Sequence, residues 1–247
     1  MARWQAAVLG AALFLCILLA TAPARLLGYV VPSQQLMLQG FQGRLWHGSA
    51  ESAVLAVSGG YLQLGRLQWD LSPWSLLLLS PRAELETYWG KQTLVADVSI
   101  SPAGEIRLRD TSLNFPARLI RHWLPVQLRG SFNLLTEDLS FQDQRPSAGS
   151  GRLVWQRARW IGNAANQKLG DYVLEFEVDE AQQLQGVIST LSGPIMVQGK
   201  VTFNQQQYSV DLELSSENGI RAEMGSALEL IAEPTDTGYH IKLEGTL

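Results

Sequence analysis

The sequence predicts an all-β, mainly antiparallel protein with one apolar helix at its N-terminus. From about residue 33 onward, short runs of alternating apolar and polar residues are separated by Gly, Pro and Asn-Gly turn signals. This pattern is typical of sheets with one apolar and one solvated face. A ten-residue phrase also occurs twice, which is typical of duplicated β architecture. We therefore expect a curved sheet, and an open apolar groove is one form that it can take.

The first element is the N-terminal segment. Residues 6–24 carry no charge, and as a helix they span roughly 28 Å, close to the roughly 30 Å hydrocarbon core of a bilayer. We expect a transmembrane anchor, with residues 1–5 in the cytoplasm and the body, 33–247, in the periplasm. A cleaved signal peptide is the alternative, because Ala20-Thr21-Ala22 resembles a processing site, although Pro23 follows it directly. A buried core helix is the third interpretation.

Strand signals then follow along the body. Four runs alternate strictly between apolar and polar side chains: 94–100, 173–178, 208–214 and 239–243. Turn signals lie between such runs, among them Asn218-Gly219, a pair that favours tight hairpins. We expect roughly a dozen strands from this spacing.

Two segments depart from the strand pattern. Pro73 begins an apolar stretch that predicts a helical turn. Asn114 precedes residues 117–124, where we expect a two-turn helix with Asn114 as its N-cap and Pro125 as its stop.

The repeated phrase, G-R-L-x-W-x-x-x-x-W, occupies residues 65–74 and 151–160. A polar, Pro- and Gly-containing stretch at 142–151 divides the chain near its middle. We predict an internal repeat with halves at about 40–130 and 131–247.

Composition limits the classes of partner. The net charge is −4 and no run of five or more basic residues occurs, so nucleic acid is not an expected partner. The single cysteine, Cys16, lies in the apolar segment. The body therefore has no cysteine for a disulfide or a thiolate metal site, as suits a periplasmic domain.

The sequence offers no reaction centre. The histidines, His47, His122 and His240, are far apart and match no zinc motif. Alternate acidic residues from Glu175 to Asp179 are interpreted as the solvated face of a strand, and no nucleotide-binding motif occurs. We predict no catalytic residue, no cofactor and no metal.

Tryptophans are the candidate functional residues. A buried indole contributes a large apolar area to a core, whereas tryptophans on an open sheet face line a groove or meet the bilayer interface. Both interpretations apply to the same five residues: Trp46, Trp69, Trp74, Trp155 and Trp160.

These features together resemble a known family. The segment 38–48, the G-R-L-x-W phrase with Ser72-Pro73-Trp74, and Leu191-Ser192-Gly193-Pro194-Ile195 followed by Gly199 resemble protein N of the bacterial type II (general) secretion pathway, GspN, over essentially the whole chain.

The resemblance implies a non-enzymatic, single-pass inner-membrane protein with a periplasmic body that assists export of folded proteins across the outer membrane. Its implied partners are the inner membrane and other secretion subunits. The resemblance also implies kinship with AsmA-like proteins, whose β-sheets curl into an apolar groove. The alternative function is therefore lipid binding or lipid transfer in the envelope, with lipid as partner.

Overall fold

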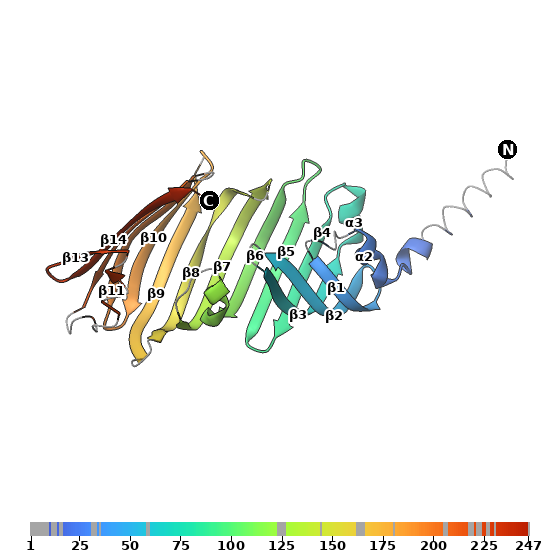
Figure 1. Cartoon of the computed structure of the whole chain (residues 1–247). Coiled ribbons are helices and arrows are strands. Elements are labelled where there is room, and N and C mark those ends of the chain that lie inside the picture. The colour runs from blue at the N-terminus through green and yellow to red at the C-terminus, as the bar shows by residue number, and fades with distance from the viewer. Residues whose placement is uncertain are drawn as a thin grey trace. The chain divides into compact units, whose positions relative to one another are not determined.

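The structure is a computed structural model, and its strands pair antiparallel throughout the described residues (Figure 1). It describes residues 10, 14, 17–30, 34, 36–57, 60–122, 127–143, 145–161, 166–179, 181–204, 207–216, 220, 224–225, 228–229 and 231–246. Fourteen strands lie in these residues, so the predicted all-β class is confirmed. Much of the expected anchor lies outside them. Within them, no helix combines the length and the apolar character needed to cross a bilayer.

Contacts within the chain define two compact units, of which unit 1 is Met1–Trp89. Each of its strands pairs antiparallel with the next. Its core joins Leu67 and Trp69 of the sheet to Ala24 and Leu27 of the N-terminal segment. Its elements are η1 (Ala24–Leu26), α2 (Leu27–Val30), β1 (Leu36–Gly43), β2 (His47–Val57), β3 (Gly60–Leu71), α3 (Pro73–Leu77) and β4 (Arg82–Trp89).

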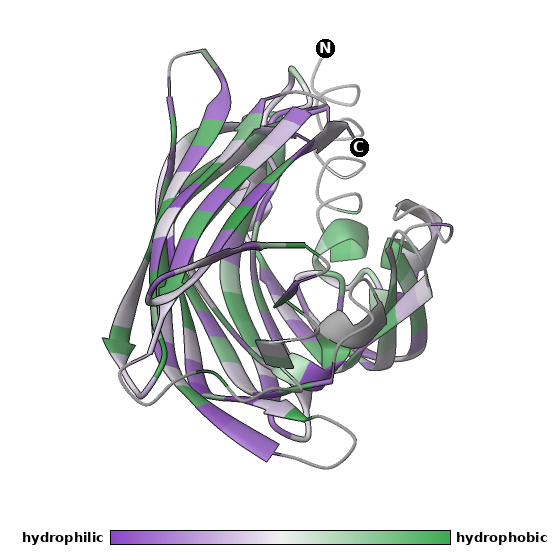
Figure 2. Cartoon of the chain, turned by 60° about the vertical axis from the view of Figure 1, so that its left-hand side comes forward, coloured by the Kyte–Doolittle hydropathy of each residue, from purple (hydrophilic) through white to green (hydrophobic). Residues whose placement is uncertain are grey.

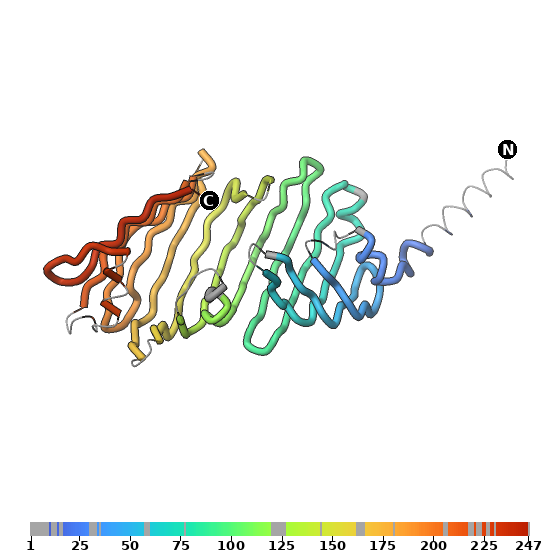
Figure 3. Tube along the Cα trace, viewed as in Figure 1, coloured from blue at the N-terminus to red at the C-terminus, as the bar shows by residue number. Residues whose placement is uncertain are grey.

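Unit 2, Gly90–Leu247, is a meander of long strands that can be followed from hairpin to hairpin in Figure 3. At its C-terminal end β14 pairs with β12, and β13 pairs on the far side of β14. Figure 2 shows these strands twisted and bent, as expected for L-residues in a sheet. Its elements are β5 (Gln92–Ile100), β6 (Ile106–Pro116), η2 (Ala117–His122), β7 (Leu128–Gln142), β8 (Arg145–Ile161), β9 (Asn166–Val178), β10 (Gln183–Ser192), β11 (Met196–Asn204), β12 (Gln207–Ser215), β13 (Glu233–Thr235) and β14 (Gly238–Thr246).

The first tryptophan of the repeated phrase has the same role in both units. Trp69 lies over Gly48 of the preceding strand, where an added Cβ would come 2.5 Å from the indole Cζ2. Trp155 lies against Gly130 of its preceding strand, where an added Cβ would come 2.8 Å from the indole Nε1. Each indole N–H donates to a backbone carbonyl, 24 and 26 residues earlier, at 2.9 and 3.1 Å. In both units, therefore, a glycine makes room for an indole that bridges two strands.

The two expected helical segments have different outcomes. Helix α3 begins at Pro73, as predicted. The segment expected as a two-turn helix at 117–124 is helical where it is described, as the 3₁₀-helix η2, Ala117–His122, but the N-cap expected at Asn114 is wrong. Asn114 lies inside β6 and its side-chain amide donates to Asn133 Oδ1 on β7 at 2.7 Å, so it bonds across the sheet and leaves no N-cap. The predicted hairpin pair Asn218-Gly219 lies outside the described residues.

Candidate functional site

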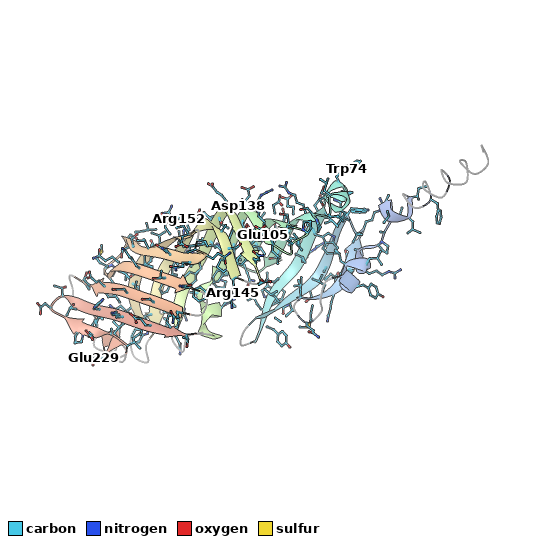
Figure 4. All side chains as sticks on the ribbon, turned by 90° about the horizontal axis from the view of Figure 1, so that it is seen from above. Trp74, Glu105, Asp138, Arg145, Arg152 and Glu229 are labelled. Carbon is cyan, nitrogen blue, oxygen red and sulfur yellow. The ribbon has the colours of Figure 1, made fainter. Side chains whose placement is uncertain are left out.

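The five candidate tryptophans occupy distinct surroundings. Trp69 is 5% exposed in the core of unit 1. Trp155 and Trp160 are half-buried and pack against the core of unit 2. Trp46 is half-buried, and its indole donates to a backbone carbonyl of the N-terminal segment. Trp74 projects from the tip of the β3–β4 connection (Figure 4), away from the strands. The structure thus does not gather the five into one site.

One face of unit 2 carries a row of aliphatic side chains, interrupted at Gly199, which we call the aliphatic row. Directly opposite residues of antiparallel strands share a face, so the strand register places these side chains next to one another. Most of them are half-buried. Such a row presents apolar area to a partner or a ligand. From β6 to β14 its positions are Leu113, Leu134, Leu153, Leu174, Ile188, Gly199, Leu212 and Ile241.

An aromatic row runs beside the aliphatic row on the same face. Its rings follow one another at centroid distances of 5.3, 5.3 and 5.9 Å and belong to Phe115, Phe132, Trp155 and Tyr172. The Tyr172 hydroxyl donates to the carbonyl of Ile195 at 3.0 Å. Burial raises the pKa of Tyr172 far above its usual value, so the phenol stays neutral and remains a donor. The row is therefore fixed at one end by a buried hydrogen bond.

The connection between β12 and β13 covers the C-terminal part of this apolar face. Met224 and Leu228 are buried there, against Tyr172, Leu214 and Ile241. The β6–β8 part of the aliphatic row is not a member of that cluster. The described cover therefore lies over the end of the face around Leu214 and Ile241, and the aliphatic row from β6 to β10 lies outside that cluster.

The opposite face of unit 2 is polar and carries both signs of charge. Its central row reads Arg152, Glu175, Val187, Lys200, Asp211 and Lys242 across β8–β14. Arg152 Nε lies 3.6 Å from Glu175 Oε1. A shallow groove of about 1020 Å³ follows this face and is lined by acidic and basic residues together. Such alternation favours cross-strand pairing within the sheet.

Two of the histidines pair with carboxylates on neighbouring strands. His47 Nδ1 lies 2.8 Å from Asp70 Oδ2, and His240 Nε2 lies 2.8 Å from Asp211 Oδ1. In the part of the chain that the structure describes, no three residues among His, Cys, Asp and Glu form a group that could hold a metal ion. His47 and His240 are thus parts of the sheet surface, each within its own unit.

The connection between β3 and β4 exposes a cluster of apolar side chains, which we call the apolar loop. Trp74, Leu78 and Leu79 are 75%, 76% and 73% exposed. The sequence placed Trp74 among the candidates through the repeat but did not single out the two leucines. Their signal was the run of four leucines after Ser75, which is too long for one helical turn to bury.

The apolar loop follows a strand end that is joined, through the β1–β2 turn, to the end of the expected anchor. The Trp46 indole donates to the carbonyl of Leu19 at 2.8 Å, and the carbonyl of Trp46 accepts from the N–H of Leu71 at 2.7 Å. Leu71 is the last residue of β3, immediately before the loop. The N–H of Leu45 also donates to the carbonyl of Ala22 at 2.8 Å. Short hydrogen bonds therefore connect the segment 17–22 to the β1–β2 turn and, through that turn, to the end of β3 that precedes the loop.

Comparison with known proteins gives one match. A family model described as protein N of the type II secretion system (T2SS) matches residues 34–242. Comparisons with curated proteins and with solved structures gave no match.

Proposed function

This chain belongs to the type II secretion system protein N family, and we propose that it is a non-enzymatic component of that system, anchored in the inner membrane, that assists export of folded proteins across the outer membrane. The family match carries this proposal, since it spans both units of the chain. The expected partners are other subunits of the secretion system. A body built from sheet edges and faces recognises partners through backbone hydrogen bonds and apolar contacts.

Strand β1 is the edge that we propose as the docking strand. Among the described strands it pairs with β2 alone, over a length of eight residues. The edge strand of unit 2, β13, has three residues and contains Pro234, which cannot donate a backbone hydrogen bond. An edge strand as long as β1 can pair with a further strand from another chain along its free side.

Site-specific photocrosslinking in cells tests this docking edge. A benzoylphenylalanine at Gln39, an exposed position on β1, should yield adducts with secretion subunits. The same replacement at Gln198, equally exposed on the internal strand β11, is the matched control and should yield none. Adducts are identified by mass spectrometry.

The same experiment can fail in two informative ways. Adducts from Gln198 but not from Gln39 would indicate that the partner contacts the sheet face and not the edge of β1. No subunit adduct at either position, together with normal export in a deletion strain, would contradict the role in secretion.

The apolar loop supports the membrane anchor. Exposed Trp and Leu side chains favour the interfacial region of a bilayer, and the loop follows the strand end that is joined to the segment 17–22 through the β1–β2 turn. If residues 6–24 span the inner membrane, the loop reaches the surface from which that span emerges. The predicted single-pass topology thus has support from a second element of unit 1.

A second candidate function is lipid binding on the apolar face of unit 2. The half-buried aliphatic row supports it, because acyl chains gain about 25 cal/mol per Å² when apolar area leaves water. The portion from β6 to β10, which lies outside the buried cluster of Met224 and Leu228, is where a chain would bind.

A further inference from the structure

Five basic side chains of unit 2 line one pocket of about 960 Å³, which we call the basic pocket: Lys91, Arg118, Arg129, Arg157 and Arg159. They come from the end of the sheet where β6 stops and β7 starts. No Asp or Glu is present among the described residues that line it. The chain as a whole is acidic, with a net charge of −4 and 19 basic residues. The pocket therefore concentrates about a quarter of the basic side chains of an acidic protein.

The strand register brings like charges directly opposite one another at this pocket. Arg129 of β7 pairs with Arg159 of β8, and Arg159 pairs with Lys168 of β9. Directly opposed like charges destabilise a sheet. The three opposed cations therefore destabilise this end of the sheet, and an anion bound against Arg129 and Arg159 offsets that repulsion.

No described carboxylate supplies that anion through an ion pair with the basic pocket. The ion pairs of Arg107 and Arg152 lie outside it. Asp171 interacts electrostatically with Lys168 and Arg157, but its two oxygens accept from the backbone N–H of Arg157 at 2.5 Å and from the hydroxyl of Ser192 at 2.9 Å. These hydrogen bonds, of which the one from Arg157 has the larger effect, hold the pKa of Asp171 below its usual value. Both carboxylate oxygens thus already have hydrogen-bond donors outside the arginine and lysine side chains.

The contact with Asp171 also fixes an unusual backbone geometry. Arg157 has φ of 51°, in the left-handed region that non-glycine residues seldom adopt. It lies where the β8–β9 register shifts. Asp171 therefore holds a bulge that keeps Arg157 at the wall of the pocket, and strained conformations of this kind cluster at functional sites.

We propose that the basic pocket binds a phosphate-bearing anion. Guanidinium groups match the geometry of phosphate oxygens and bind them through two parallel hydrogen bonds. Four arginines and a lysine around one cavity require more negative charge than a single carboxylate supplies. A phosphate monoester or a cluster of phosphates meets this requirement and removes the repulsion between Arg129 and Arg159.

The position of the basic pocket beside the apolar face indicates two sources of phosphate to compare, a lipid headgroup and free phosphate. The Trp155 indole donates to the carbonyl of Arg129 at 3.1 Å, so the aromatic row of the apolar face begins directly beside the basic pocket. A lipid with an anionic headgroup can present its phosphate to the pocket and its chains to that face. Free phosphate can use the pocket alone.

Thermal unfolding of the full-length protein in neutral detergent tests the site. The midpoint is followed by tryptophan fluorescence at low ionic strength, where charge repulsion is least screened. One series adds inorganic phosphate against chloride at equal ionic strength, and another adds phosphatidic acid to the micelles against phosphatidylcholine. The variant is R129Q/R159Q, and the matched control is R152Q, a change of the same kind on β8 outside the basic pocket.

The wild type should gain stability with the phosphate ligand, as binding to the folded state requires. In R129Q/R159Q the midpoint without ligand should rise, and the apparent affinity should fall by about tenfold or more, since two charged hydrogen-bonding groups are lost. R152Q should respond like the wild type. A response to phosphatidic acid alone identifies a lipid headgroup, and an equal response to inorganic phosphate identifies the free ion. No response in either series, or an undiminished response in R129Q/R159Q, would overturn the proposal.

Discussion

At the scale of single residues, Trp69 and Trp74 belong to the same phrase but meet opposite surroundings. Trp69 points from β3 onto the glycine of the neighbouring strand and closes the core of unit 1. Trp74 lies just beyond the end of β3, in the first turn of α3, where no strand is opposite. The position of the strand end therefore decides whether an indole serves the core or the surface.

Replacing each of these two tryptophans by alanine distinguishes the role of Trp69 in the core from that of Trp74 on the surface. Trp69→Ala should lower the free energy of unfolding by about 3–5 kcal/mol, because it removes a large buried ring and leaves a cavity. Trp74→Ala, the same change at an exposed position, should alter it by no more than about 0.5 kcal/mol. Urea unfolding measures both. A small loss for Trp69→Ala would mean that its indole does not close the core.

At the scale of elements, the N-terminal segment and the apolar loop are related through the β1–β2 turn. Residues 17–22 are joined to the β1–β2 turn by the hydrogen bonds of Trp46 and Leu45, and that turn is joined to the end of β3. The apolar loop begins directly after that strand end. Membrane contact by both elements together is the arrangement that this geometry favours.

Fluorescence quenching tests that arrangement. In a Cys16→Ser background, Leu78→Cys carrying an environment-sensitive dye should be quenched by lipids with spin labels near the headgroup, in nanodiscs of phosphatidylethanolamine and phosphatidylglycerol. Tyr61→Cys is the control, because Tyr61 is 71% exposed at the opposite end of β3, and it should not be quenched.

A third label separates the loop from the anchor. Ile17→Cys reports on the N-terminal segment itself. Quenching at position 17 but not at 78 would refute membrane contact by the loop and retain the anchor. Quenching at neither position would refute both.

At the scale of the whole molecule, the two faces of unit 2 divide its surface by chemistry. The aliphatic and aromatic rows occupy one face, and paired charges of both signs occupy the other. The side chains project to both sides of the strands of this unit (Figure 4). A ligand with acyl chains should therefore distinguish the two faces.

Adjacent residues of β10 provide a matched test of this distinction. Ile188→Glu places a charge in the aliphatic row, and Val187→Glu places the same charge on the polar face, where Val187 is 53% exposed. If the apolar face binds acyl chains, the first change should weaken binding of a dansyl-labelled fatty acid by about tenfold, and the second should leave it unchanged. Circular dichroism verifies folding, and Ile188→Ser serves if the glutamate variant unfolds. Equal binding by all folded variants would exclude the apolar face as the lipid site.

Much of the β architecture could be predicted because alternation is a local property. The runs at 94–100, 173–178, 208–214 and 239–243 all lie in strands, and Leu174 and Phe176 point away from Glu175 as their order requires. The N-cap expected at Asn114 could not be rejected from the local sequence, because the side chain of Asn114 is hydrogen-bonded to a strand that follows it in the chain. The repeat in sequence was visible, but the glycine beneath each indole was not.

The sequence by itself determined that this chain forms antiparallel strands with one apolar and one polar face, since side chains alternate with period two whatever lies beside them. Only the tertiary structure decided which residues become neighbours across the strands, because register joins positions far apart in the chain. No basic cluster is visible along the sequence, yet pairing and hairpin ends gather Lys91, Arg118, Arg129, Arg157 and Arg159 around one pocket. Electrostatic repulsion and ligand binding depend on distance in space, and that distance is set by the fold.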